Sequence, residues 1–236
     1  MMGLWFDEGR VVGAALFDMY FGEAFVGALE EYKHLYNEIL KYAYDNLKDD
    51  SGLGVAIHDG DEHAVQIALK QGFVKQDNQE TIMSLSLNKN LLVNLPSDIS
   101  FTEIDPMKDA YELQWLFWQG FDHGADKKQF EQEEEITPQK RKHFNPHLTV
   151  AAINEKQEMV GLAGAWYDPR TEYAYLEPVC VIPAYRKKGI AKAMIYEVAN
   201  RCGSLGAKKL YVLTDFVFYE RLGFVIEERY TFFAKG

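Results

Sequence analysis

The chain has 236 residues, a formal net charge of -11 and 47% hydrophobic residues, values typical of a globular protein of one or two domains. The acidic balance argues against a nucleic-acid partner, because neutralising phosphates requires clustered Lys and Arg. The two cysteines, Cys180 and Cys202, make no disulfide framework and lack metal-ligand spacing, so no metal site is expected. No signal peptide precedes the first strand and no apolar run is long enough to span a bilayer, which predicts a cytoplasmic protein without a membrane partner.

The first ninety residues are predicted to alternate strands with two helices. Short apolar runs indicate strands at 10–17, 23–29 and 53–57, and alternation indicates another at 81–87. From Glu30 the apolar period changes to three and four residues, which indicates an amphipathic helix ending near Gly52. A second helix is expected at 61–70, closed by Gly72.

A polar stretch at 88–90 and the sequence Leu95-Pro96-Ser97-Asp98 indicate a domain junction, so domains of 1–92 and 93–236 are expected. Strands are predicted beyond it at 99–104, 148–153, 159–166, 173–182, 209–213 and 230–234. Helices are predicted at 110–121, 189–202 and 216–221.

Two pairs of segments suggest an internal duplication. Val12-Gly13-Ala14-Ala15 resembles Val160-Gly161-Leu162-Ala163, and Gln71-Gly72-Phe73-Val74 resembles Leu222-Gly223-Phe224-Val225. Between these landmarks both halves have the same order of strand, helix, strand and short helix. We interpret this as two diverged copies of one unit, with chance similarity of apolar strands as the alternative.

The segment 177–192 reads as a strand, a tight turn and the start of a helix. Arg186, Lys187 and Lys188 stand immediately before Gly189. The free amides and the dipole of a helix N-terminus favour an anion, and glycine lets the backbone approach a ligand closely. The pattern predicts a pyrophosphate cradle without the spacing of a Walker or dinucleotide loop; a solvated basic turn is the alternative.

The spacing Val181-x-Pro183-x-x-Arg186-x-x-Gly189-Ile190-Ala191 resembles the acetyl-CoA-binding motif of GNAT acetyltransferases. Tyr219-Glu220-Arg221-Leu222-Gly223-Phe224 resembles the closing Tyr-x-x-x-Gly-Phe signature of that family. The resemblance implies an α+β fold, a mixed α/β sandwich with a central mixed sheet flanked by helices. It also implies that acetyl-CoA is the co-substrate of an N-acetyltransferase.

The same resemblance divides the two halves by role. Residues 93–236 would be the catalytic domain. Residues 1–92 would be a degenerate, non-catalytic partner, because the turn at 28–33 carries acidic residues and no Arg-x-x-Gly, and Ala68 stands where the signature has tyrosine. The partner also begins too late for the first strand and two helices of the family, so a start further upstream is an alternative.

The resemblance implies a set of site residues. Tyr219 would be the general acid and Glu177 the general base, with Glu172 as a second candidate and a structural or substrate-contacting role for Glu177 left open. Pro178 would mark a bulge or splayed edge, and the Val181 N–H would stabilise the oxyanion. The segments that would bind the cofactor are Val179, Cys180 and Val181 along the strand and Arg186, Lys187, Lys188, Gly189, Ile190, Ala191 and Lys192 around the turn.

The expected reaction is acetyl transfer to a primary amine of a small molecule, peptide or protein. Two alternatives remain at this stage: a non-catalytic acyl-CoA-binding regulator, and an enzyme that uses a longer acyl donor. Cys180 is interpreted as a buried strand residue rather than an acyl-enzyme nucleophile. The sequence leaves both a monomer and a homodimer open.

Overall fold

The computed structural model describes residues 2–17, 21–136 and 145–236, and the chain divides into two compact units. Unit 1 holds residues 1–83, 213–216 and 226–236, and unit 2 holds 84–212 and 217–225. The predicted domains, 1–92 and 93–236, are each continuous in sequence. The two units are not continuous, because the C-terminal strand pairs with a strand of the first half.

Unit 1 is a sheet with both helices on one face. Its strand order is β1-β2-β3-β4-β11-β5; β1-β2, β2-β3 and β4-β11 are antiparallel pairs, and β3 and β4 run parallel. The strands are β1 (Met2–Asp7), β2 (Arg10–Phe17), β3 (Glu23–Ala28), β4 (Leu53–His58), β11 (Val225–Lys235) and β5 (Val74–Ser86). Residues 84–86 of β5 and Val225 of β11 belong to unit 2. A 3-10 helix η1 (Glu30–Leu35) leads into α1 (Tyr36–Leu47), and α2 (Glu62–Lys70) follows β4. Ile39, Leu40, Val55, Phe73 and Phe233 belong to one hydrophobic core between helices and sheet.

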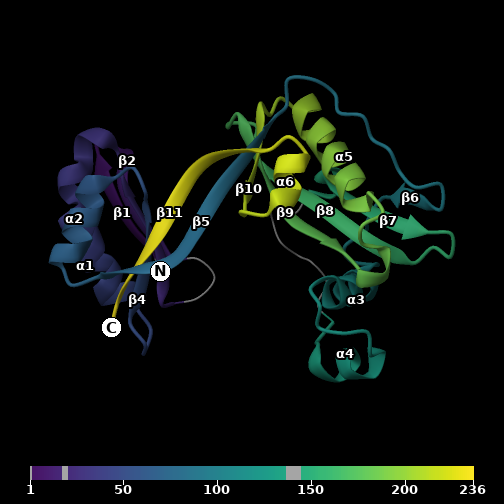
Figure 1. Cartoon of the computed structure of the whole chain (residues 1–236), viewed down its shortest axis with the longest axis horizontal. Helices are drawn as coiled ribbons and strands as arrows, with labels where there is room; N and C mark the ends of the chain where they lie inside the picture. The colour runs from purple at the N-terminus through teal and green to yellow at the C-terminus, as the bar shows by residue number, and fades with distance from the viewer. Residues whose placement is uncertain (1, 18–20, 137–144) are drawn as a thin grey trace. The chain divides into compact units, whose positions relative to one another are not determined.

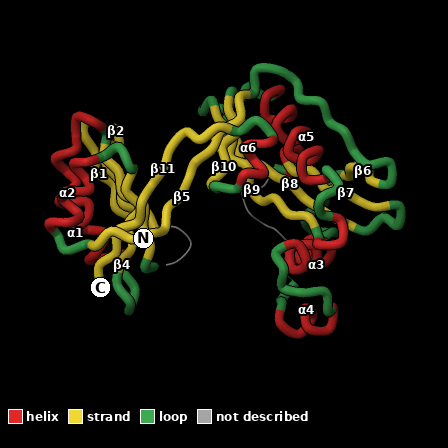
Figure 2. The backbone as a smooth tube through the Cα atoms, in the orientation of Figure 1, coloured by secondary structure: helices red, strands yellow, loops and turns green. Residues whose placement is uncertain are grey.

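Unit 2 is a sheet with helices on both faces (Figures 1 and 2). Its order is β10-β9-β8-β7-β6, with β9 and β10 parallel and the rest antiparallel. The strands are β6 (Ile99–Thr102), β7 (Thr149–Asn154), β8 (Met159–Tyr167), β9 (Tyr173–Val181) and β10 (Lys209–Leu213). The helices are α3 (Ala110–Gly120), α4 (Lys127–Glu133), α5 (Ile190–Ser204) and α6 (Val217–Arg221), with 3-10 turns η2 (Pro146–Leu148) and η3 (Pro183–Tyr185).

The two faces of β8 contact different helices. A Cβ added to Gly161 would lie 2.9 Å from the methyl carbon of Met194 on α5. Leu162, the next residue, packs with Leu113 and Leu116 of α3. Successive strand residues point to opposite faces, so α5 and α3 cover opposite sides of this sheet.

Hydrogen bonds at matching positions confirm the internal duplication. The Leu29 N–H donates to the Val12 carbonyl at 2.9 Å, and the Ile182 N–H donates to the Val160 carbonyl at 3.0 Å. The acceptor in each bond is the valine that begins a matched segment, Val12 in the first half and Val160 in the second. Likewise the Phe73 N–H donates to the Ala68 carbonyl at 3.0 Å, and the same bond joins Phe224 to Tyr219 at 3.1 Å. Ala68 therefore occupies the structural position of Tyr219.

Most predicted elements are present, and the differences are in strands β1, β5 and β11. The sequence analysis missed β1 and predicted only the last part of β5 and of β11. The residues at 74–80 are mostly polar, so they give no apolar alternation, and this stretch is a strand because its backbone joins a sheet. In the described ranges, no helix is long and apolar enough to cross a membrane.

Candidate active site

Strand β9 separates from β10 partway along its length. The parallel register joins Tyr173–Tyr175 to Lys209–Tyr211, and from Leu176 onward β9 continues beside β8 alone. The β8–β9 register also shifts: Ala163 faces Val179 and Ala165 faces Leu176. Glu177 and Pro178 thus both stand opposite one residue, which confirms the bulge predicted at Pro178.

The separated part of β9 presents main-chain donors on its open edge. Because Ile182 donates its N–H to Val160 on β8, the alternation of an antiparallel ladder directs the Val179 and Val181 N–H groups away from β8. The structure describes no strand on that side of these two residues. This edge can accept an extended chain as an added strand.

The turn after β9 leaves a second set of donors at the start of α5. Lys187 has φ 62° and Gly189 has φ 85°, left-handed values that glycine adopts at little cost. The α-helical ladder begins with Ala193 N–H donating to the Gly189 carbonyl at 3.0 Å, so the amides of 187–192 precede it. A Cβ at Gly189 would meet no atom within 4 Å, so the main chain there is open to a ligand.

The partly exposed Arg186 side chain holds this turn in place. Its Nε donates to the Val181 carbonyl at 2.9 Å, and its Nη2 donates to the Gly120 carbonyl at 2.9 Å. The guanidinium also pairs with the Asp122 carboxylate at 2.9 Å. These contacts join the turn to β9 and to the end of α3. Gly120 and Asp122 lie more than sixty residues away in sequence, so no local pattern could have indicated these two partners.

The Arg186 amide differs from its predicted role. The sequence analysis expected the amides from Arg186 to Ala191 to form the cradle. The Arg186 N–H instead closes the η3 turn by donating to the Pro183 carbonyl at 3.2 Å, so the series of uncommitted amides begins at Lys187.

Three lysines give the turn its positive charge. Lys187, Lys188 and Lys192 are all exposed. The Lys188 Nζ lies 4.5 Å from the centre of the Tyr185 ring, and the Lys192 Nζ lies 5.3 Å from that of Tyr196. Cations beside a helix N-terminus oppose its dipole, so an anion bound at this place would relieve the repulsion.

Tyr219 lies in a nearly closed aromatic environment on α6. The residue is 8% exposed, and its ring contacts Phe218 and Phe224 edge to face. Burial raises the pKa of Tyr219, so its hydroxyl keeps its proton at neutral pH. The hydroxyl has no hydrogen-bond partner among the described residues. Tyr196 of α5 fixes the end of this helix by donating to the Leu222 carbonyl at 3.1 Å.

Cys180 is a packing residue, as expected from the sequence. Burial raises the pKa of its thiol to about 12, which leaves it protonated and unreactive at neutral pH. A Cβ at Gly120 would lie 2.8 Å from the Cys180 Cβ, so α3 and β9 are in close contact here. This contact forms the floor beneath the open edge of β9.

The two candidate bases lie on or before β9. Glu177 is exposed within the bulge, between the open edge and the part of β9 that pairs with β10. Glu172 precedes the strand, and its main-chain carbonyl accepts from Lys208 at 2.6 Å. Of the two, Glu177 alone adjoins the open edge. In the described part of the chain, no three His, Cys, Asp or Glu side chains form a metal-binding group.

These features match the chemistry of coenzyme A. The amides of 187–192 and the lysines suit a pyrophosphate. The Val179 and Val181 N–H groups suit the amides of a pantetheine arm. The two donor sets follow each other along one stretch of chain, as a ligand with a diphosphate and an extended amide arm requires.

Comparison with known proteins agrees with this geometry. Residues 107–224 match the model of the acetyltransferase (GNAT) family, and this match spans half of the chain. The chain is a member of the GNAT acetyltransferase family. No curated protein matches the sequence.

Solved structures show that the GNAT fold extends over nearly the whole chain. A GCN5-related N-acetyltransferase from Sphaerobacter thermophilus has a TM-score of 0.70 and 16% identity, covering 97% of this chain and 78% of its own. A tandem GNAT protein from the clavulanic acid biosynthesis pathway has a TM-score of 0.61 and 16% identity, covering 97% and 80%. A GCN5-related N-acetyltransferase from Kribbella flavida has a TM-score of 0.61 and 13% identity, covering 96% and 88%. At these identities the likeness concerns the fold.

In the first GNAT-like half, a side chain occupies the main-chain donor that is open to a ligand in the second half. Ala28 corresponds to Val181, since each precedes the residue that bonds to the matching valine of the neighbouring strand. The Ala28 N–H donates to the hydroxyl of Tyr36 at 3.4 Å, and Tyr36 is 5% exposed. The turn there carries Glu30 and Glu31. A side chain and two carboxylates therefore stand where the second half offers amides and lysines.

Proposed function

We propose that the second half of this protein transfers an acetyl group from acetyl-CoA to a primary amine. Family membership supports an acyl-CoA-dependent transferase. The observation that carries the proposal is the continuous run of main-chain donors from the open edge of β9 to the start of α5, held in place by Arg186.

In this proposal each residue has one task. The amides of 187–192 bind the pyrophosphate, and the Val179 N–H pairs with the pantetheine arm. The Val181 N–H stabilises negative charge on the carbonyl oxygen. Acetyl-CoA supplies the acetyl group as an activated thioester.

Proton transfer falls to two side chains. The exposed Glu177 carboxylate accepts a proton from the incoming ammonium group, directly or through a water. The amine nitrogen then forms a bond to the thioester carbonyl carbon, and the C–S bond breaks. Tyr219, whose raised pKa keeps its proton in place until then, donates that proton to the departing thiolate, and the second proton lost by the nitrogen restores the phenol.

The test combines calorimetry with an assay of thiol release. We expect coenzyme A and acetyl-CoA to bind, and a panel of primary amines to release coenzyme A from acetyl-CoA. Absence of heat with either nucleotide would overturn the proposal.

Two other outcomes would redirect it. Tight binding without turnover for any amine would indicate an acyl-CoA-binding regulator. Preference for a longer chain in competition among acyl-CoAs would keep the transferase and change its donor.

A further inference from the structure

A cavity of 840 Å³ opens beside the first half of β9. Asn145 and Pro146 line one side of it, and the loop from β8 to β9 lines another. The remaining lining residues are Trp166, Tyr167, Asp168, Pro169, Arg170, Thr171, Tyr173 and Tyr175. The cavity lies wholly within unit 2, and its volume is in the range of small-molecule sites.

The cavity and the basic turn lie toward opposite ends of the same strand. Tyr173 and Tyr175 line the cavity, Glu177 follows two residues later, and the turn begins after Val181. At about 3.3 Å per residue, Tyr175 and Val181 are separated by roughly 20 Å of strand. A ligand anchored at the turn and extended along the open edge would thus meet the contents of the cavity near Glu177.

Four of the ten described residues that line the cavity are aromatic. Trp166 and Tyr175 are direct neighbours in the β8–β9 register, so their side chains stand on one face of the sheet. The Tyr173 ring is held edge to face by Tyr211, with 5.6 Å between centroids. Two prolines complete the apolar surface. Such walls favour a planar apolar group, because aromatic pairs add to the energy of burial alone.

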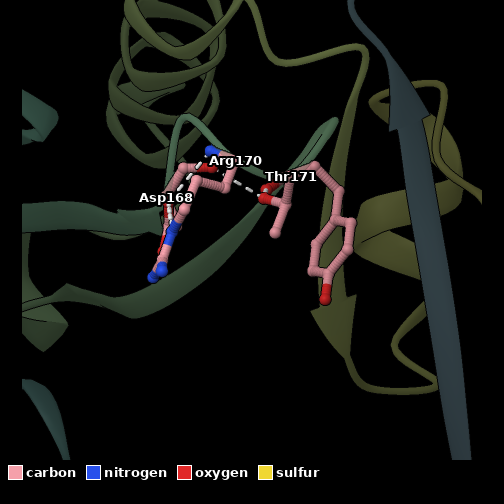
Figure 3. Close-up of polar contacts among 4 residues, drawn as sticks. Asp168, Arg170 and Thr171 are labelled. Carbon is pink, nitrogen blue, oxygen red and sulfur yellow. Dashed lines mark hydrogen bonds and ion pairs between the residues drawn. The ribbon is translucent and has the colours of Figure 1, made fainter. Parts of the chain in front are cut away.

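The charged residues of the rim neutralise each other. The Arg170 Nε donates to both carboxylate oxygens of Asp168 at 3.0 Å (Figure 3). The main-chain N–H of Arg170 donates to Asp168 Oδ1 at 2.9 Å. The Thr171 hydroxyl donates to the Asp168 carbonyl at 2.8 Å, which fixes the turn. Because Asp168 and Arg170 form an ion pair, the described lining of the cavity carries no net charge. The lining therefore selects for neither a polycation nor an anion.

We propose that the acetyl acceptor is an amine carrying an aromatic ring, and that the ring lies in this cavity with the amino group directed toward Glu177. The proposal rests on the transferase function proposed above and names the class of its acceptor.

The test compares two amines that differ in the planarity of one ring. 2-Phenylethylamine and 2-cyclohexylethylamine have the same carbon skeleton and a similar amine. We expect kcat/KM to be about five-fold higher for the aromatic amine, the ratio that corresponds to an aromatic contact. The Tyr175→Leu variant should bring that ratio close to one.

A matched control uses Tyr44→Leu, which removes a tyrosine ring from unit 1, far along the chain from the cavity. It should leave the ratio unchanged. Because each ratio is measured within one variant, partial loss of folded protein cancels out.

A direct binding readout keeps the two proposals distinguishable. 2-Phenylethylamine should change the tryptophan fluorescence of the wild-type protein and not of Trp166→Phe. Equal kcat/KM values for both amines, or a preference for aliphatic diamines, would overturn the aromatic acceptor and leave the transferase standing. A Trp166-dependent fluorescence change without turnover of this or any other amine would uphold the cavity assignment and overturn the transferase. No fluorescence change would overturn the cavity assignment.

Discussion

Tyr219 and Cys180 are buried for different purposes. Burial raises the pKa of both. For the proposed general acid this is useful, because the phenol keeps its proton at neutral pH. For a thiol it removes the reactive form.

Replacing Tyr219 by Phe should lower kcat by about 10²-fold, the size of a general-acid contribution, with little change in the affinity for acetyl-CoA. Steady-state kinetics and calorimetry give the two values. Since the pKa of Tyr219 is raised, its deprotonation should reduce kcat only above pH 10. Tyr196→Phe removes a hydroxyl that bonds the Leu222 carbonyl; it should cost stability while kcat stays near that of the wild type. Equal loss of kcat in both variants would contradict the acid role.

Both thiols should resist alkylation in the folded protein. The pKa of Cys180 and of Cys202 is raised to about 12, so roughly one thiol in 10⁴ is ionised at pH 8. The pKa of each folded thiol exceeds that of a cysteine in the unfolded chain. The stabilisation gained by burying the neutral thiol is therefore fully present below the pKa of the unfolded cysteine, and it is lost as pH rises toward 12. Mass spectrometry after iodoacetamide should find modification only in denaturant. Rapid labelling of native Cys180 would refute the packing role.

At the scale of elements, Arg186 joins three segments that form the site. Its side chain reaches the carbonyls of β9 and of α3. Lys187, one residue later, carries the same charge, and no hydrogen bond or ion pair of its side chain is described.

Arg186→Gln and Lys187→Gln each remove one positive charge, so their difference isolates the contacts of Arg186. We expect Arg186→Gln to raise the Kd for coenzyme A about tenfold and to lower the Tm, because carbonyls that accept charge-assisted hydrogen bonds lose them. Lys187→Gln should weaken binding less, mainly at low salt, and leave the Tm unchanged. Calorimetry and thermal denaturation measure these effects. Indistinguishable variants would show that Arg186 acts by charge alone.

At the scale of the whole molecule, one chain carries two copies of a unit and one open site. The Tyr36 hydroxyl accepts from the main-chain donor of the first copy, and Ala68 stands at the position of Tyr219. Calorimetry should therefore give one coenzyme A per chain. Gly189→Asp, which adds a carboxylate and a Cβ at a left-handed position, should abolish that binding. Residual binding of one equivalent in this variant would place the site in the first half.

The C-terminal strand stabilises the first unit, although it follows the second in sequence. Phe233 on β11 is 2% exposed in the core with α1 and α2. Phe233→Ala should lower the free energy of unfolding by about 3–5 kcal/mol, as measured in urea. Val225→Ala, at a residue 59% exposed on the same strand, should be near neutral. A neutral Phe233→Ala would contradict this packing.

Local sequence patterns predict many of the secondary-structure elements and the family. Apolar periods at α5 and along β8 and β9 predict these elements, and Pro178 predicts the bulge, because each depends on neighbours within a few residues. The Gly189 turn and the Tyr219 signature likewise identify the family. Duplication was visible because the matching segments kept the same order.

Long-range contacts decided the rest. The sequence motif indicates that Arg186 is a cation facing a phosphate. In the structure its guanidinium donates to main-chain carbonyls of β9 and of the end of α3. The stretch at 74–80 is polar and is still a strand, because sheet neighbours satisfy its backbone. The place of β11 depends on residues far apart in the chain, because it pairs with β4. Local sequence sets which conformations a segment prefers, and only the tertiary structure determines which distant groups complete its hydrogen bonds and cover its apolar face.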